Sequence, residues 1–204
     1  MRLELDHLAI SAATLAEGVA MVEALLGAPL AAGGVHPTMG THNRLLSLGP
    51  GLYLEVIAVD PVAPRPDAPR WFDLDRFSGP PRLTHWICRC DDLDRALAVA
   101  PPGMGTPVAF ARGDYRWRFA VPPTGVLPCD DTHPALIQWQ GARHPAADLP
   151  ESGCRLRRLV VAHPEAPALR RHLAALHDPR IVVETGPKAL VAEIETPDGV
   201  KVLR

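Results

Sequence analysis

One short pattern occurs three times along the chain at nearly constant spacing. Residues 5–8 (LDHL) are matched by residues 83–86 (LTHW), 78 positions later, and by residues 156–159 (LRRL) after a further 73 positions. The first two copies carry a histidine at the same place, His7 and His85. Each copy opens an apolar run that leads into a helix-like stretch and then into further strand-like runs. Repetition of a unit this long predicts a fold built from repeated modules, in which two histidines are brought together.

Composition sets the class of protein. A chain of 204 residues, 47% hydrophobic and 22% charged, is long enough for a substantial core and is unlike a disordered segment. The net charge of −2 and the lack of a basic run exclude nucleic acid as an expected partner. The charged N-terminus does not resemble a signal peptide, and no apolar run reaches the length needed to span a membrane. Four cysteines without a disulfide pattern suit a reducing compartment, so a cytoplasmic location is expected.

The first expected module covers residues 1–60. Its strand at residues 3–12 is followed by Thr14, which can cap a helix, with Glu17 three positions later as in a capping box. Apolar residues at helical spacing extend that helix over residues 15–26. A Gly-Gly loop is expected next, before two strands, at residues 43–48 and 52–59.

Two more modules are expected, at residues 82–141 and 154–204. Each begins with a strand, at residues 82–90 and 155–162, and continues with a helix, the last over residues 165–176. Residues 61–81 are rich in proline, which removes backbone donors and favours a linker that crosses the surface. The aromatic centre of this linker predicts that it docks on one of the modules.

These units resemble the vicinal oxygen chelate superfamily, which includes glyoxalases, bleomycin-resistance proteins and dioxygenases. The resemblance rests on the first-strand histidines of the first two modules, on residues 36–45 (HPTMGTHNRL) with residues 53–57 (YLEVI), and on the TPDG turn at residues 196–199. Within the superfamily, residues 36–45 and 53–57 are similar to a glyoxalase-like domain family. The implied fold is α+β with repeated βαβββ modules: two modules pair around a cavity, and a third, degenerate module is structural.

The resemblance also implies a metal centre with two ligands from each of the paired modules. Position by position these are His7 and Glu55 from the first module, and His85 and Gln138 from the second. Imidazole and carboxylate ligands suit Zn, Ni, Mn or Fe(II), and such a metal would polarise a substrate carbonyl. The third module offers Arg158 where the others have histidine, which does not suit a divalent metal. Because Gln138 is a poor base, Glu55 is the only ionisable oxygen ligand and the candidate catalytic base.

Each of these residues also has a simpler interpretation. His7 and His85 can be core histidines whose ring nitrogens bond to backbone carbonyls. Glu55 can point to solvent, since side chains alternate along a strand. If Glu55 faces inward instead, its burial among apolar neighbours favours a paired or ligated carboxylate.

Substrate contacts are expected from two polar segments. His36 and Asn43 lie in a polar cluster beside glycines, where they can reach substrate oxygens or bond only to the local backbone. Arg116 alternates with Trp117 on an expected strand and can bind a substrate carboxylate if it faces inward. The opposite orientation would make it part of a basic surface stripe.

Three functions are consistent with this set of residues. The first is a metal-dependent lyase or isomerase acting on a small oxygenated molecule. The second is a metal-free protein that sequesters a small ligand in the same cavity, with tryptophan and arginine on its walls. The third is a non-haem Fe(II) dioxygenase with His7, His85 and Glu55 as its facial triad. Because an odd number of modules leaves one unpaired, a homodimer is also expected.

Overall fold

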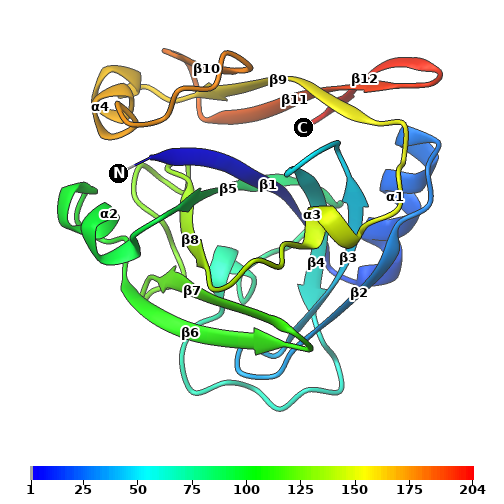
Figure 1. The fold of residues 1–204 in the computed structure, drawn as a ribbon, viewed down its shortest axis with the longest axis horizontal. Coiled ribbons are helices and arrows are strands. Elements are labelled where there is room, and N and C mark those ends of the chain that lie inside the picture. Colours follow the sequence, from blue (N-terminus) through cyan, green and yellow to red (C-terminus); the bar gives the residue numbers. More distant parts are fainter. Residues whose placement is uncertain (1) are drawn as a thin grey trace.

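A single curved sheet built from two modules forms the larger part of the molecule. In the computed structural model, which describes residues 2–204, its eight strands run in the order β2-β3-β4-β1-β5-β8-β7-β6. The sheet curls until its two edges approach one another (Figure 1). The first module contains β1 (Leu3–Ser11), α1 (Leu15–Leu26), β2 (Ala31–His36), β3 (Thr41–Ser47) and β4 (Tyr53–Val59). The second contains β5 (Arg82–Cys90), α2 (Leu93–Val99), β6 (Thr106–Arg112), β7 (Tyr115–Val121) and β8 (Ala135–Trp139).

The modules join through β1 and β5, which pair antiparallel in the middle of the sheet. Within each module the first strand pairs parallel with the last, β1 with β4 and β5 with β8. The first strands therefore lie next to each other at the centre. This arrangement confirms the expected α+β fold, in which two paired βαβββ modules surround a cavity.

Helix α1 follows the sequence rules closely. Thr14 accepts a hydrogen bond from the backbone N–H of Glu17 at 3.2 Å, and Gly27 ends the helix in the left-handed region at φ 69°. The expectation of a loop after this helix is wrong, because residues 31–36 form β2. Its two glycines leave room that Asn43 and Arg112 fill: a Cβ on Gly33 would collide with Asn43, and one on Gly34 would collide with Arg112.

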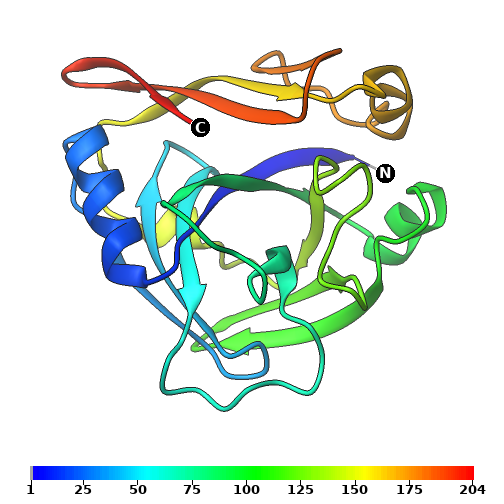
Figure 2. The same cartoon turned by 180° about the vertical axis from the view of Figure 1, so that it is seen from behind.

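The third module forms a separate four-stranded sheet. It contains β9 (Arg155–Ala162), α4 (Ala166–His172), β10 (Ile181–Glu184), β11 (Ala189–Thr196) and β12 (Gly199–Leu203), and is preceded by the short α3 (Pro145–Asp148). The chain order is again βαβββ, but the strand order is β10-β9-β11-β12, so the first strand does not pair with the last. Helix α4 is shorter than the expected 165–176. This sheet lies across the outside of β1 and β5 (Figures 1 and 2).

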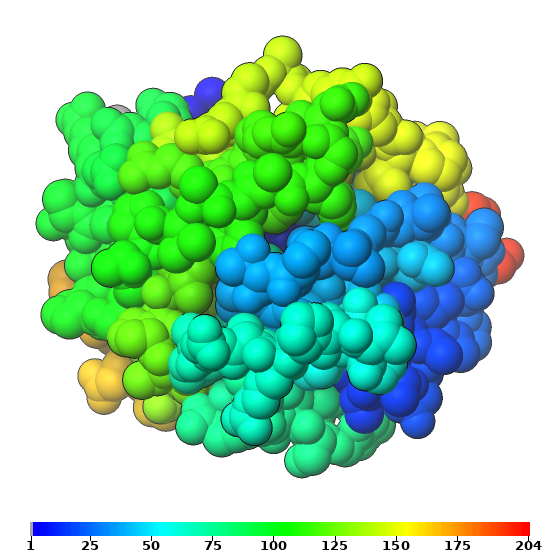
Figure 3. Space-filling model, turned by 90° about the horizontal axis from the view of Figure 1, so that it is seen from below, coloured from blue at the N-terminus to red at the C-terminus, as the bar shows by residue number. Residues whose placement is uncertain are grey.

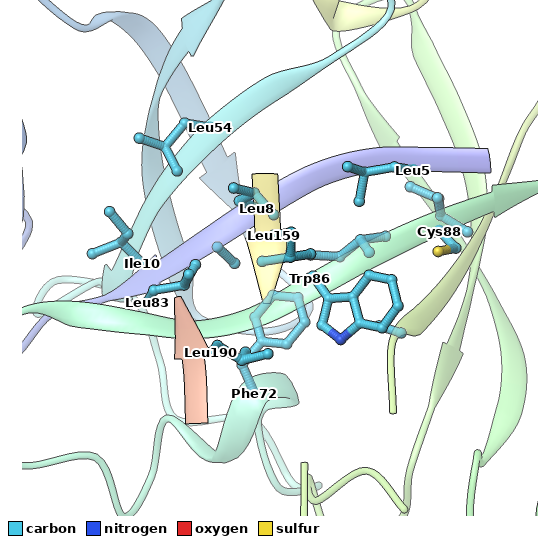
Figure 4. Packing of buried hydrophobic residues seen from close by; sticks show 14 of the residues in the cluster. Leu5, Leu8, Ile10, Leu54, Phe72, Leu83, Trp86, Cys88, Leu159 and Leu190 are labelled. Carbon is cyan, nitrogen blue, oxygen red and sulfur yellow. The ribbon is translucent and has the colours of Figure 1, made fainter. Parts of the chain in front are cut away.

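One apolar cluster connects the two sheets. Leu8 of β1, Trp86 of β5 and Leu159 of β9 are all fully buried and lie close together (Figure 4). Leu190 of β11 belongs to the same cluster and lies beside Phe72. The third module therefore shares its core with the paired modules, although its sheet is separate.

The centre of the proline-rich segment forms a wedge, defined here as Trp71 and Phe72, inside the curve of the large sheet. Both side chains are buried in the short helical turn η1 (Trp71–Asp73), visible within the curve in Figure 2. Phe72 and Asp73 have left-handed backbone angles, φ 58° and 50°, which non-glycine residues rarely adopt. Hydrogen bonds hold this segment in place, because the Arg70 guanidinium donates to both the Asp75 carboxylate and the Gly40 carbonyl.

Replacing Gly125 with alanine is expected to displace the wedge and to lower the free energy of unfolding by about 2–4 kcal/mol. Gly125 has φ 76°, its carbonyl accepts the N–H of Asp73 at 3.0 Å, and a Cβ there would collide with the Arg70 carbonyl. Urea unfolding measures the change. Gly113→Ala is the control, because Gly113 has a similar φ of 54° but open space around it. Equal losses in the two variants would contradict the proposed collision.

No helix among residues 2–204 combines the length and apolar character needed to cross a membrane. The cytoplasmic location and the homodimer remain predictions.

Candidate active site

A small cavity opens on the concave side of the large sheet. Its volume is about 40 Å³, enough for a few water molecules. A narrow opening between the blue and green segments is visible at the centre of the face in Figure 3. Polar groups lie among aromatic walls; the lining residues are His7, His36, Asn43, Leu45, Tyr53, Glu55, Trp71, Phe72, Arg112, Trp117, Phe119, Ile137 and Trp139.

Glu55 and His7 form a buried pair at this cavity. Glu55 is only 6% exposed and His7 only 4%, and Glu55 Oε2 lies 3.6 Å from His7 Nε2. The other carboxylate oxygen, Oε1, accepts a hydrogen bond of 2.5 Å from the amide of Asn43. The imidazole of His7 stacks on the ring of Tyr53 at 4.4 Å. Glu55 thus faces inward, and its predicted alternative, a solvent-facing carboxylate, is wrong.

Asp6 binds the nitrogen of the His7 ring that faces away from Glu55. Its carboxylate is fully buried and accepts three hydrogen bonds, from His7 Nδ1 at 2.6 Å, Trp139 Nε1 at 2.9 Å and His144 Nε2 at 2.9 Å. Simple strand alternation would place neighbouring residues on opposite faces. The register between β1 and β5 shifts between Leu5 and His7, and such a bulge lets Asp6 reach the ring of its neighbour.

The charges in this buried network stabilise one another. Burial opposes ionisation of Glu55, but its contacts with His7 and Asn43 outweigh this and lower its pKa to about 2. Burial likewise opposes the charged form of His7, yet the carboxylates of Asp6 and Glu55 raise its pKa to about 9. Burial of Asp6 is outweighed by hydrogen bonds from His144 and His7, so its pKa is lowered. At neutral pH His7 is therefore an imidazolium between two carboxylates.

Asn43 is held in one orientation. Its side-chain oxygen accepts hydrogen bonds from the backbone N–H of Gly34 at 2.8 Å and from Arg112 Nη1 at 3.2 Å, so its NH₂ group must face Glu55. Among the ion pairs of residues 2–204, none involves Arg112. A guanidinium without a carboxylate partner thus lies at the cavity wall.

His36 also lines the cavity. Its Nδ1 lies 3.0 Å from Thr41 Oγ1, and its ring meets Trp71 edge-on at 5.1 Å. Burial lowers its pKa to about 4, so the imidazole is neutral near pH 7. The structure therefore places both predicted first-module contacts, His36 and Asn43, beside Glu55, while their contact with a substrate remains a proposal.

His85 does not join this cavity. It is buried against Phe72, with ring centroids 4.8 Å apart, and Phe72 itself lines the cavity that holds His7. The wedge therefore separates the two histidines that the repeat places at equivalent positions. Neither ring nitrogen of His85 has a hydrogen-bond partner, so the alternative of a core histidine bonded to backbone does not describe it either.

The prediction that Gln138 is a metal ligand is wrong, because its side chain faces away from the cavity. Its amide donates to the carbonyl of Asp91 at 2.7 Å and accepts from Arg118 at 3.2 Å. Its neighbours Ile137 and Trp139 line the cavity instead.

Strand register identifies the residue that matches Glu55 in the second module. Ala9 pairs with Glu55 in the first module. The equivalent of Ala9, two positions after the histidine, is Ile87, which pairs with Ala135. The second module therefore presents a methyl group where the first presents a carboxylate.

Arg116 is likewise misassigned as a cavity residue. It is exposed, and its guanidinium donates to the carbonyls of Gly113 and Tyr115 in its own hairpin. The cavity arginine is Arg112, on the preceding strand β6. Sequence reasoning also missed Asp6 and Trp139. Side chains alternate between the two faces of β8, so an outward-facing Gln138 implies that its neighbour Trp139 faces the cavity. The sequence therefore held a signal for Trp139.

These positions do not fit the four-ligand metal centre that the resemblance implies. His7 and Glu55 face each other, but His85 lies behind Phe72 and Gln138 points outward. Asn43 turns its NH₂ group, which cannot ligate a metal, toward the site. Within residues 2–204 no group of three or more His, Cys, Asp or Glu side chains is arranged to hold a metal ion.

Two βαβββ modules joined through their first strands around a cavity define a member of the vicinal oxygen chelate superfamily. The chain belongs to the glyoxalase-like domain family, whose profile matches residues 5–177. No match is found among curated proteins.

One solved structure supports this fold, and a second is reported as similar. A hypothetical protein from Staphylococcus aureus is similar over 99% of this chain and 84% of its own, with a TM-score of 0.57 and 10% identity. Methylmalonyl-CoA epimerase from Mycobacterium tuberculosis is similar over 70% of this chain and 91% of its own, with a TM-score of 0.44 and 22% identity.

Proposed function

We propose that this protein is an enzyme of the lyase or isomerase class that moves a proton on a small oxygenated molecule, with Glu55 as the base. The observation that carries the proposal is the buried Glu55–His7 pair at the floor of an aromatic cavity. Burying two charges is costly and contributes little net stability, so an ion pair of this kind in a cavity favours a catalytic role.

The substrate class follows from the other wall residues. Arg112 carries a charge that no carboxylate in the described chain neutralises, and guanidinium groups bind carboxylates well. The aromatic walls suit a short carbon skeleton, and the cavity of about 40 Å³ admits only a few heavy atoms. We therefore propose a small carboxylic acid with a carbonyl group next to an acidic C–H bond.

Proton transfer uses the two charged residues in turn. The carbonyl oxygen of the substrate takes the place of Glu55 as the acceptor for His7 Nε2–H, and the imidazolium stabilises the negative charge that develops there. Loss of that contact raises the pKa of Glu55 from its low value toward that of an ordinary carboxylate, which makes it a better base. Glu55 then accepts the C–H proton and returns it to the same carbon as the enolate collapses to the carbonyl. Asp6 holds His7 in place.

No step of this mechanism passes through a metal, because the second module supplies no ligand to the site. The same arrangement removes the support for a facial-triad dioxygenase, since His85 is separated from His7 and Glu55 by Phe72. The metal-free ligand-binding function remains a second candidate. It is favoured by the walls of Trp71, Trp117 and Trp139, which suit binding without chemistry.

Proton exchange distinguishes these functions. We expect the wild-type protein in D₂O to exchange the C–H proton next to the carbonyl of one or more small oxo-carboxylic acids, followed by proton NMR. Glu55→Gln keeps the shape of the site but removes the base, so exchange should fall by about 10²–10⁴-fold. Treatment with EDTA should leave the wild-type rate unchanged.

Two results would contradict the proposal. Binding of these acids without exchange in the wild-type protein would favour the ligand-binding function. Loss of exchange after EDTA treatment, together with a stoichiometric metal that disappears in His7→Ala, would restore the metal-dependent mechanism. Arg112→Ala removes the guanidinium proposed to bind the substrate carboxylate, so exchange should slow. Arg116→Ala is the matched control, because Arg116 lies outside the cavity and its loss should leave exchange unaffected.

A further inference from the structure

A second, larger cavity lies where the paired modules meet the third module. Its volume is about 390 Å³, within the usual range for small-molecule sites. The wedge and the start of β5 form one side, and the turn into β11 forms the other; the walls include Phe72, Phe77, Arg82, His85, Lys188 and Leu190. Phe72 is shared with the first cavity, so one ring separates the two spaces.

His85 is the feature of this cavity that indicates a ligand. Its side chain is 3% exposed, and neither ring nitrogen has a hydrogen-bond partner. The nearest acid, Asp131 Oδ1, lies 3.5 Å from Nε2, an ion-pair distance too long for a good hydrogen bond, and it already accepts the N–H of Leu127 at 2.6 Å. Buried polar groups are nearly always satisfied, and leaving one unpaired costs free energy. A bound molecule with polar atoms would satisfy this imidazole.

The charges around the cavity favour an anion. Arg82 and Lys188 form no ion pair with an acid in the described chain, and Arg82 instead packs over the ring of Phe77 at 4.4 Å. The wall contains two acids: Asp73 pairs with Arg76 at 2.8 Å, and Asp131 lies 3.5 Å from His85 Nε2. Four basic side chains line the same cavity, at positions 76, 82, 188 and 204, so positive charge is in excess. Arg82 donates to the carbonyls of Ser78 and Pro80, but neither Arg82 nor Lys188 has an ion-pair partner among residues 2–204. Both lie next to an apolar surface formed by Phe72, Leu83 and Leu190.

We propose that this second cavity is a binding site for a small organic anion with an apolar body, such as an aromatic carboxylate. Lys188 and Arg82 bind its carboxylate, His85 hydrogen-bonds to one of its polar atoms, and its ring packs on Phe72 and Leu190. The site is separate from the Glu55 cavity and does not depend on the proposed chemistry there.

Benzoate is a suitable probe, because it combines the charge and the ring, and benzyl alcohol is its neutral counterpart. Calorimetric titration should detect benzoate binding at millimolar concentration, with benzyl alcohol bound much more weakly. Lys188→Ala should weaken benzoate about tenfold, the effect of one charge-assisted contact. Lys201→Ala, on β12 and outside the cavity, is the control and should leave binding unchanged.

The two lysines of the chain also report the position of the probe directly. After reductive methylation with ¹³C-formaldehyde, which preserves the charge, benzoate should shift the NMR signal of Lys188 and not that of Lys201. His85→Phe, which removes the ring nitrogens but fills the space, should weaken binding as well. If that variant does not fold, the exposed Lys188 still provides the test.

Three outcomes would overturn the proposal. The first is no benzoate binding at millimolar concentration. The second is equal binding of benzoate and benzyl alcohol. The third is binding that is lost in Arg112→Ala but kept in Lys188→Ala, since this would place the probe in the first cavity. None of these outcomes bears on proton exchange at Glu55, so the two proposals fail separately.

Discussion

Asp6→Asn is expected to lower the free energy of unfolding by about 3–5 kcal/mol at neutral pH, the usual effect of removing one partner from a buried charge network. The wild-type carboxylate is fully buried and accepts hydrogen bonds from His7, Trp139 and His144. An asparagine has one acceptor oxygen, and its NH₂ group would face at least one of these donors. The charge of His7 would then be balanced only by Glu55.

Urea unfolding at pH 7 measures this loss, and Asp94→Asn provides the control. Asp94 also forms an ion pair, with Arg118 at 2.8 Å, but its side chain is 66% exposed. Exposed pairs contribute little to stability, so the control should unfold like the wild type. A similarly small effect for Asp6→Asn would mean that the buried network does not stabilise the fold.

The stability of the wild-type protein is expected to fall as the pH rises from about 6.5 toward 9. The folded-state pKa of His7 is raised to about 9, against an ordinary value of 6.5, so the folded state holds this proton more tightly. The contribution is fully present below pH 6.5 and is lost as the pH rises through the folded pKa. Its size is on the order of 3 kcal/mol.

Stability is also expected to fall on the acid side. His36 and His133, the latter buried two residues before β8, have pKa values lowered to about 4, mainly by burial. Their contribution is present above pH 6.5 and is lost as the pH falls toward 4. Glu55, with a pKa lowered to about 2, acts below that: its contribution is present above pH 4.5 and is lost as the pH falls toward 2. Maximum stability is therefore expected near pH 6.5.

Thermal or urea unfolding across pH 4–10 tests both slopes. The alkaline slope should shrink in Asp6→Asn, because the carboxylate that raises the pKa of His7 loses its charge. His7→Gln should lack that slope while retaining the acid one. An alkaline slope of wild-type size in His7→Gln would assign the effect to another group.

The parts of the fold that depend on residues close together in the sequence were predicted most accurately. The helix at residues 15–26 was bounded correctly, because its cap and its end depend on residues within a few positions of each other. The pairing of the first two modules was predicted from the repeat and the resemblance together. The strand at residues 31–36 was missed, because its glycines are accommodated by Asn43 and Arg112, which lie on other strands.

Only the residues that the first module contributes to the candidate site were predicted correctly from the sequence. His7, His36, Asn43 and Glu55 meet because they lie on β1, β2, β3 and β4, which are adjacent in one module. The two residues predicted from the second module do not reach the site, for two different reasons. Gln138 faces outward, because the register aligns Ala135 with the position of Glu55, and His85 is blocked by a wedge from the proline-rich segment.

Four features could be predicted without the structure: the repeat, the module order, the capped first helix and the four polar residues of the first module. Each of them depends on neighbours along the chain or on the strand order within one module. Which residues of the second module reach the site depends on packing between distant parts of the chain. The insertion of Trp71 and Phe72 and the packing of the third module onto β1 and β5 depend on contacts between residues far apart in the chain. Such contacts leave no periodic pattern in the sequence, which is why Arg112 and the second cavity emerge only from the folded chain.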